Sequence, residues 1–584
     1  MIKRKARLAA AAGLAAALVL TGCSKNEGDD DDAGAHATSD VDIISTDPEE
    51  SKGPADEVKG AKEGGSLEIL SMTHFSHPDP QRNYTGTSMM AMGGFVYRSL
   101  AGYREDSEGN VKVVGDLATT PGTDVNGDCT TWEYELKDGL KYEDGKDVTA
   151  EDVAYGIARS FSASLQDGPQ FLADWLDPER KYKGMWDADG EKIDGAETTP
   201  PGVTVDGNKL TMEFDQPRCE VPFAAAMSTT TPVPAAEDTG LDYDKRPFSS
   251  GPYKIKENKE GSSITLERNE HWDADSDPLR HAFPDEVVYT FGEEASESTV
   301  RMEANASGDE HLVDINGIHP DSLADIMQNE ADFEGRLASA PQQYTSYLAI
   351  NNETVPDLNV RQAINHAFPR DRWIQAQGGT DAQLPSTTLI GPTVPGYEEY
   401  DVYPYDVDKA KELLDGEEPT IRYAHSDTPL GGQVASMLEE EYEKAGIKIE
   451  AVPIPPDNYY DQIAAPDHDY DLYRNIWGQD WPSGSTVVPP LWHSTGIDAG
   501  TNYPRLDDPE VDKKIDELLE SDKPFAETGP EWNELGKWIQ EEHAPVVPTD
   551  YLVGNWLVGS EVGGLQISNW ISTIDTRKLY VKDA

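Results

Sequence analysis

Apolar and polar positions repeat at two different spacings along the chain, which predicts a protein of mixed helices and strands. In TTWEYELKDGLKYEDG, Trp132, Tyr134 and Leu136 alternate with polar residues, which is the period of a strand with one buried face. Helical spacing follows in TAEDVAYGIARSF, where Thr149 and Asp152 have the positions of a capping box at the start of a helix.

A second region predicts two parallel strands joined by a helix. PTIRYAH, from about Thr420, and IKIEAVPI, after Gly446, have the composition of strands, and QVASMLEEEYEKAG between them has helical spacing. Parallel neighbours need such a crossover, so we expect a βαβ unit here. We also expect a strand at 66–70 and helices at 88–100, 360–368 and 509–520.

The first residues have the pattern of an export signal. A basic start precedes LAAAAGLAAALVL, an apolar run of 13 residues, whereas a membrane span needs about 20. The tetrapeptide Leu20-Thr21-Gly22-Cys23 resembles the bacterial lipobox, in which the cysteine is lipidated and begins the mature protein. We therefore expect residues 1–22 to be a lipoprotein signal peptide and Cys23 to carry the lipid. The alternative is an ordinary secreted protein with an incidental cysteine.

Residues 23–64 are expected to form an acidic tether without structure. This segment has almost no large apolar side chains, and four consecutive aspartates occupy 29–32. Such a composition buries too little surface to offset the entropy of ordering the chain.

The charge and length exclude some classes of function. The net charge of −62 is spread along the 584 residues, which opposes binding to nucleic acid and to anionic lipid surfaces. About 520 residues remain after the tether, too many for one hydrophobic core, so we expect two or more domains in a monomeric chain.

Two cysteines remain besides Cys23. Cys129 precedes the strand-like run TWEYEL, and Cys219 follows the strand-like run NKLTMEF. If the two strands pair, the cysteines come together, and an oxidising compartment favours a disulfide between them. Two separate buried thiols are the alternative.

The sequence lacks the common motifs of enzymes and cofactor sites. There is no HExxH, GxSxG, Walker A or GxGxxG motif. His74 and His77 form HxxH, but prolines follow closely and no further zinc ligands can be named. We therefore expect neither catalysis nor a cofactor or metal.

Several segments resemble one protein family, in the order in which that family has them. LKDGLKYEDG and TAEDVAYGIAR are similar to a turn LRxGVKFxDG and a helix TAxDVxYSxxR, and SSGPYKI, VRQAINHAF, DVDKAKELL and NYPRLDDPEVDKKIDELL match later segments. The chain resembles the family 5 extracellular solute-binding proteins, the dipeptide- and oligopeptide-binding components of ABC importers, over about residues 65–580.

This resemblance implies a two-lobed, periplasmic-binding-protein-like α/β fold with an additional α/β subdomain on the first lobe. The implied first lobe comprises 65–85, 245–342 and 546–584, with the subdomain inserted at 86–244. The implied second lobe comprises 343–545. Chain crossings near Gln343 and Pro545 would form the hinge on which the lobes close over a ligand.

The segment IWGQDWPSGS resembles the family loop GWxxDxxDP, whose first aspartate pairs with the α-ammonium group of peptide ligands. The matching residue is Asp480, with Trp477, Gly478 and Trp481 beside it. A carboxylate between two indoles is partly desolvated, which strengthens its hydrogen bond to an ammonium group, and the ring faces add cation–π attraction. The alternative is that Asp480 only caps a turn before Pro482.

One departure from the family bears on ligand length. Dipeptide-specific members carry Arg-Pro-Tyr after the strand that opens the βαβ unit, whereas here YAHSDTPLGG has no arginine. Longer oligopeptides, held through backbone hydrogen bonds, are therefore expected. By position in the implied fold, the other candidates for the cleft wall are Thr73, His74, Phe75, Trp492, Asn502, Tyr503 and Trp556.

The resemblance implies a bacterial lipoprotein on the extracellular face of the cytoplasmic membrane that delivers oligopeptides to ABC permease subunits. A sugar oligomer or a metal chelate bound by the same fold is one alternative, because tryptophans stack on sugars. A surface-anchored hydrolase is another, and turnover of added peptides would reveal it.

Cys23→Ser should release the protein into the medium, because a polar tether without a lipid has no affinity for the membrane. Fractionation of cells that produce either form tests this. A Cys23→Ser protein that stays in the membrane fraction would show that Cys23 is not the anchor.

Overall fold

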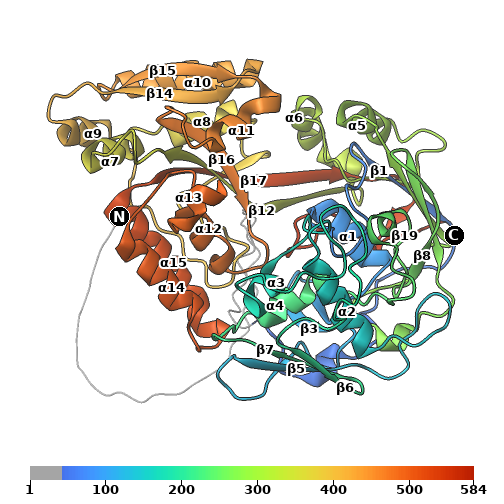
Figure 1. The fold of residues 1–584 in the computed structure, drawn as a ribbon. Helices are drawn as coiled ribbons and strands as arrows, with labels where there is room; N and C mark the ends of the chain where they lie inside the picture. The colour runs from blue at the N-terminus through green and yellow to red at the C-terminus, as the bar shows by residue number, and fades with distance from the viewer. Residues whose placement is uncertain (1–42) are drawn as a thin grey trace, which may run out of the picture. The chain divides into compact units, whose positions relative to one another are not determined.

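The structure is a computed structural model that describes residues 43–584, so the expected signal peptide and Cys23 lie outside the described residues. None of the helices within 43–584 combines the length and the apolar character that crossing a bilayer requires. The described residues contain five sheets, and the three largest position the site (Figure 1).

The first sheet has the strand order β11-β1-β10-β9-β8, in which β1 is parallel to both of its neighbours. Because side chains alternate across a strand, Ile69 packs against Phe95 on one face of β1, and Leu70 packs with Met302 and Ile326 on the other. The strands are β1 (Ser66–Ser71), β8 (Tyr253–Lys259), β9 (Ser263–Arg268), β10 (Glu286–Phe291) and β11 (Leu312–Asp314). The covering helices are α1 (Gly86–Phe95), α5 (Ala295–Ala304) and α6 (Pro320–Gln328).

The second sheet has six strands in the order β13-β17-β12-β16-β14-β15 and is covered by helices on both faces. Leu348 and Ile350 of β12 pack toward α7 and α10, whereas Tyr347 and Ala349 pack toward α12, α14 and α15. The strands are β12 (Leu337–Ile350), β13 (Gln383–Pro385), β14 (Thr420–Ser426), β15 (Lys448–Ile454), β16 (Leu472–Gly478) and β17 (Val546–Leu557). The helices are α7 (Leu358–His366), α8 (Arg370–Ala376), α9 (Val407–Leu414), α10 (Pro429–Glu443), α11 (Tyr459–Ala464), α12 (Val488–Trp492), α13 (Thr495–Ala499), α14 (Pro509–Leu519) and α15 (Phe525–His543).

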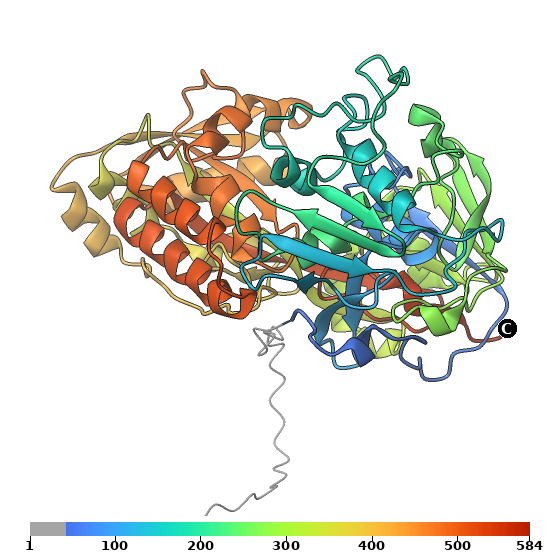
Figure 2. The same ribbon diagram turned by 60° about the horizontal axis from the view of Figure 1, so that its bottom comes forward.

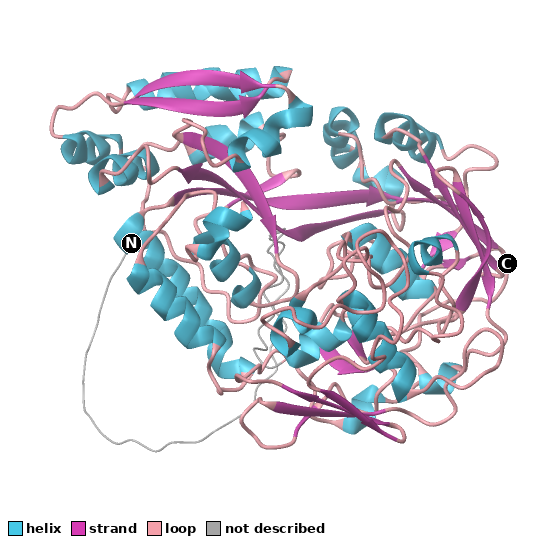
Figure 3. Cartoon of the chain, viewed as in Figure 1, coloured by secondary structure: helices cyan, strands magenta, loops and turns pink. Residues whose placement is uncertain are grey.

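The long strands β12 and β17 connect the first two sheets. They pair along nearly their whole length, from Leu337 opposite Leu557 to Ala349 opposite Val546. Val558, just past the end of β17, bridges to Val313 of the five-stranded sheet. Figure 3 shows this pair of strands running from one group of helices to the other. The register shifts between Pro341 and Thr345, so the regular ladder is interrupted there.

A third sheet, in the order β4-β5-β7-β6, lies within the segment that the sequence assigned to an inserted subdomain. Trp132 and Met212 on its inner face pack against Val153 and Ile157 of α2. The elements of this region are β2 (Ala101–Glu105), β3 (Val111–Gly115), β4 (Thr123–Asp124), β5 (Thr131–Glu135), α2 (Ala150–Ser160), α3 (Phe171–Leu176), β6 (Val203–Asp206), β7 (Lys209–Glu213) and α4 (Val221–Ala226). A short pair, β18 (Val562–Gly563) and β19 (Tyr580–Val581), lies near the C-terminus.

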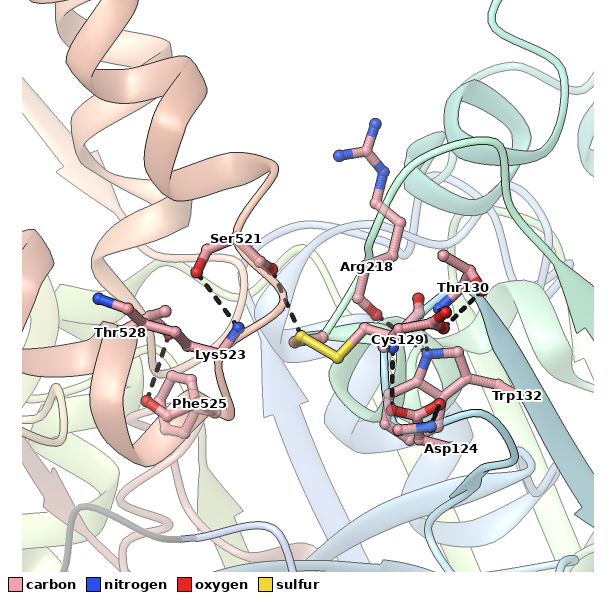
Figure 4. The surroundings of a disulfide bond; sticks show 12 residues. Asp124, Cys129, Thr130, Trp132, Arg218, Ser521, Lys523, Phe525 and Thr528 are labelled. Carbon is pink, nitrogen blue, oxygen red and sulfur yellow. Dashed lines mark hydrogen bonds between the residues drawn. A yellow bond between two sulfur atoms is a disulfide. The ribbon is translucent and has the colours of Figure 1, made fainter.

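Antiparallel pairing of β5 with β7 brings Cys129 and Cys219 together. The structure joins them in a disulfide with an S–S distance of 1.98 Å and a Cα–Cα distance of 4.9 Å. The indole nitrogen of Trp132 donates to the carbonyl oxygens of Cys129 and of Arg218, and so holds both chain segments at the disulfide (Figure 4).

The local predictions with the clearest physical basis are confirmed. Thr149 caps α2, and its side chain and that of Asp152 exchange hydrogen bonds with each other's backbone in a capping box. β14 and β15 are parallel and α10 lies between them in sequence, as expected of the βαβ unit. The helix expected at 88–100 is shorter in the structure, where α1 comprises Gly86–Phe95.

The prediction of an unstructured tether is wrong for residues 43–64. Ile43 is buried and Ile44 bridges to Val113. The carboxylates of Glu50 and Asp56 pair with Lys112 and Arg104. Two adjacent isoleucines and two ion pairs thus dock this segment against β3, and the sparse apolar content of the segment as a whole did not reveal this.

Replacing Cys129 and Cys219 together by serine should lower the free energy of unfolding of this region. The disulfide closes a loop of 90 residues, for which chain entropy suggests about 4.6 kcal/mol. Denaturant unfolding of the variant beside the parent protein measures this loss. Two thiols that can be alkylated in the native protein would rule out the bond.

Candidate functional site

Asp480 lies in the loop that follows β16, and it is held from two sides. Its Oδ1 accepts a hydrogen bond of 2.5 Å from the hydroxyl of Tyr84, which lies just before α1. Its backbone N–H donates to the hydroxyl of Thr486 at 3.2 Å. The carboxylate thus stands where the loop of the six-stranded sheet meets the region around α1.

A cavity of about 510 Å³ opens beside Asp480. This volume is in the range of about 300–1,000 Å³ that is usual for small-ligand sites. Its aromatic walls come from two parts of the chain, namely α3 and the region from β16 to α15: Phe171, Trp175, Trp477, Trp481 and Trp532. The ionisable residues that line it are Arg218, Glu220, Asp480, His493, Asp516 and Lys523.

Asp480 has no cationic partner among residues 43–584, although it is largely enclosed. Burial raises the pKa of its carboxyl to about 6, and the hydrogen bond from Tyr84 offsets only part of that shift. Burial, with the Asp480 charge beside it, also raises the pKa of the Tyr84 hydroxyl, which therefore remains a donor. A desolvated carboxylate with one neutral donor can accept a charge-assisted hydrogen bond from an ammonium group.

Trp481 lines the cavity and is also part of the hydrophobic core of the inserted segment. Only 2% of its surface is exposed, and its ring lies 4.4 Å from Phe171 and 6.2 Å from Phe223 between centroids. Its indole N–H donates to Glu220, at 2.8 Å. Hydroxyls of Ser483 and Ser485 donate to the same carboxylate. Glu220 therefore ties three residues of the Asp480 loop to the N-terminus of α4.

Trp477 and Gly478 shape the approach to Asp480. Trp477 lines the cavity and donates its indole N–H to the Thr486 carbonyl at 2.8 Å. Gly478 pairs with Tyr344 of β12, and a Cβ atom there would lie 2.4 Å from the Tyr344 ring. Glycine is required at this position because any side chain would displace that tyrosine.

A second contact between the same two regions lies at the disulfide. Arg218 donates to the carbonyl of Leu519 at 3.3 Å, and Sγ of Cys219 lies 3.5 Å from the carbonyl oxygen of Ser521. Leu519 ends α14, and Ser521 lies in the turn before α15. Figures 1 and 2 both place the end of these helices beside the inserted segment, and Figure 4 shows the turn facing the disulfide.

The loop after β1 does not reach this cavity. His74 and Phe75 line a different cavity, of about 320 Å³, together with Asp244 and Ile264. Phe75 is buried there against Tyr289 and Phe291, and the exposed Thr73 accepts a hydrogen bond from Ser71 through its carbonyl. The ring of Phe75 faces the underlying sheet, which is why this loop turns away from Asp480.

Four more expected wall residues are structural in the described chain. Trp492 and Trp556 are each at most 3% exposed and belong to hydrophobic cores. Asn502 is buried and closes its own loop with hydrogen bonds to His493 and Leu506. Tyr503 packs against the core of the second sheet. Each of the four therefore packs or bonds within the described protein, and their role as ligand contacts stays a prediction.

The sequence did not reveal the walls that come from the inserted segment. Phe171, Trp175, Arg218 and Glu220 lie far from Asp480 along the chain, as does Tyr84 just before the inserted segment, and no motif marks any of them. One signal was available in the sequence. Arg218 and Glu220 flank Cys219, so the disulfide that holds Cys219 also holds the backbone of both neighbours.

Within residues 43–584 no group of three or more histidine, cysteine or acidic side chains is arranged to hold a metal ion. The nitrogen Nδ1 of His77 instead lies 2.9 Å from a carboxylate oxygen of Asp244. The cavity thus offers an anionic acceptor and hydrophobic walls, which suits the binding of a charged organic molecule.

Comparison with known proteins places this fold. Residues 112–499 match the profile of the bacterial extracellular solute-binding proteins, family 5, middle region. The chain is 22% identical over 517 residues to the oligopeptide-binding protein OppA of Bacillus subtilis, covering 81% of this chain and 87% of that one. It is 24% identical over 473 residues to heme-binding protein A of Haemophilus influenzae, covering 74% and 78%.

Among solved structures, the clavulanic acid biosynthesis oligopeptide binding protein 2 superposes with a TM-score of 0.80 and 25% identity. The superposition covers 94% of this chain and 99% of that one. The two-lobed α/β fold expected from the sequence is thereby confirmed.

Proposed function

The chain belongs to the family 5 bacterial extracellular solute-binding proteins, which are non-enzymatic transport receptors, and we propose that it binds peptides through their free amino end at Asp480. The observation that carries this proposal is the enclosed carboxylate of Asp480, which lines a cavity and has no cation beside it. A peptide ammonium group would supply the missing charge. The names of several relatives, oligopeptide-binding protein OppA among them, agree with a peptide ligand.

The proposed cycle uses hinge closure and delivery to ABC permease subunits. The crossings expected near Gln343 and Pro545 coincide with the interrupted ladder of β12 and with the start of β17. Interruption of a ladder leaves fewer hydrogen bonds to break when a strand bends. The lipid on Cys23 would keep the receptor on the extracellular face of the membrane, near the permease.

A sugar oligomer or metal chelate is a weaker candidate. Sugar stacking needs accessible ring faces. Of the tryptophans that line the cavity, Trp481 and Trp532 are at most 2% exposed, and Trp175 and Trp477 are only partly exposed. No cluster of metal ligands is found in residues 43–584 to favour a chelated metal. Neither ligand would account for an enclosed carboxylate at Asp480.

Asp480→Asn should weaken the binding of a peptide with a free amino end by more than tenfold, since loss of one partner of an enclosed charge pair costs about 2–5 kcal/mol. N-acetylation of the peptide should cost the parent protein a similar amount. Titration calorimetry on the four combinations of protein and peptide measures both effects.

The decisive comparison is the doubly changed pair. If Asp480 holds the ammonium group, acetylation costs the Asp480→Asn protein little further affinity. Strictly additive losses would show that the two groups do not meet. No loss from either change would exclude binding by the amino end.

Peptide affinity should also depend on pH. The pKa of Asp480 is about 6 in the free protein, and a bound ammonium group lowers it, so binding is full above pH 6 and is lost as the pH falls through that value. Between pH 7.5 and pH 5 we expect about a tenfold loss of affinity. Calorimetry at both values tests this. The Asp480→Asn protein is the control, and an equal pH dependence in that variant would assign the effect to another group.

A further inference from the structure

The charged groups that line the cavity do not all have partners. His493 and Asp516 approach to 3.4 Å and Lys523 pairs with Glu531 at 2.5 Å. Glu220 is satisfied by its three donors from the Asp480 loop. Within 43–584, the Asp480 carboxylate has the hydrogen bond from the Tyr84 hydroxyl but no ion pair. Arg218 is the other charged lining residue without an ion pair in that range.

Arg218 has no ion pair among residues 43–584. Its Nε is out of contact with water and has no hydrogen-bond partner in that range, and its guanidinium donates a hydrogen bond to the Leu519 carbonyl. The guanidinium lies over the ring of Trp175, 5.7 Å from its centre. Figure 4 shows it extending away from the disulfide into the space between the inserted segment and the turn before α15.

Burial lowers the pKa of the Arg218 guanidinium, and the nearby Glu520 charge only partly offsets this. An arginine side chain nevertheless stays charged at neutral pH. The disulfide at Cys219 and the bond from the Trp132 indole to the Arg218 carbonyl fix its backbone. The protein thus fixes a cation that has no ion pair within the described residues beside a cavity that Asp480 also lines.

We propose that Arg218 binds the carboxylate end of a short peptide whose ammonium end is bound by Asp480, an inference that rests on the function proposed above. A zwitterionic ligand would neutralise both groups at once, and a planar guanidinium can hold a carboxylate through two hydrogen bonds. The arginine that is missing after β14 is then supplied by the inserted segment instead.

The cavity also limits the length of such a ligand. Arg218 and Asp480 line the same cavity of about 510 Å³. Because an extended chain spans about 3.3–3.6 Å per residue, a peptide whose two ends reach two walls of one such cavity is short, and tripeptides are the first length to test. This proposal departs from the longer oligopeptides expected from the sequence, which stay a prediction.

The experiment uses one library of tripeptides in three forms: free at both ends, N-acetylated, and C-amidated. Each is equilibrated with the purified protein, and the bound fraction is measured by mass spectrometry. The proteins compared are the parent, Arg218→Gln and Arg218→Lys. Arg180→Gln is the matched control, because Arg180 also lies 5.7 Å from an aromatic ring, that of Phe161, but is already paired with Asp174.

We expect amidation to reduce binding to the parent protein by about tenfold or more. The Arg218→Gln protein should bind the free peptides as weakly as the parent binds the amides, and amidation should cost it no further affinity. The Arg218→Lys protein should recover part of the lost affinity, and the Arg180→Gln protein should bind like the parent. Equal binding of free and amidated peptides by the parent would overturn the assignment of Arg218, even if a variant failed to fold.

The outcomes for the two ends are separable. If acetylation abolishes binding and amidation does not, the proposed function stands and the role of Arg218 fails. If peptides of eight or nine residues bind and free tripeptides do not, the proposed length is wrong and the carboxylate is not held at Arg218. If no peptide in any form binds, the proposed function itself fails.

Discussion

The site depends on the insertion of one indole, that of Trp481, into the core of a distant segment. Its ring completes an aromatic cluster with Phe171, Trp175 and Phe223, and its N–H is bonded to Glu220. Because Asp480 directly precedes Trp481, the insertion of this indole fixes the position and direction of the Asp480 carboxylate. The cavity has walls from both regions only while Trp481 is seated.

Electrostatics follow from that packing. The packing takes the Asp480 carboxylate and the Nε of Arg218 largely out of water, and neither side chain has an ion pair within 43–584. An enclosed charge without an ion pair is costly, and a zwitterionic ligand would relieve both costs together. The other charged groups that line the cavity have ion-pair partners or, in Glu220, three hydrogen-bond donors, which is why we propose these two as ligand contacts.

Much of the fold could be predicted from local patterns, whereas most of the site could not. The capping box of Thr149 and the βαβ unit depend on spacings within a few residues, which the sequence displays directly. Trp492 could not be distinguished from a wall residue, since cores and ligand clefts both exclude water from indoles. The contact of Glu220 with Trp481 joins residues 261 positions apart, and only the tertiary fold determines it.

The anchor at Trp481 combines a hydrogen-bonded carboxylate with a buried ring, and the two contribute differently. Taking the Glu220 carboxylate out of water costs several kcal/mol, and its three hydrogen-bond donors offset that cost. Burial of an aromatic ring removes about 150–250 Å² from water, which is worth about 4–6 kcal/mol at about 25 cal/mol per Å². The Trp481 ring therefore contributes the larger net attraction, whereas the bonds to Glu220 determine which residues of the Asp480 loop meet α4. If the receptor opens and closes over its ligand as we propose, the ring is the contact that opening must break, and a ligand that binds only when both walls are present adds to it.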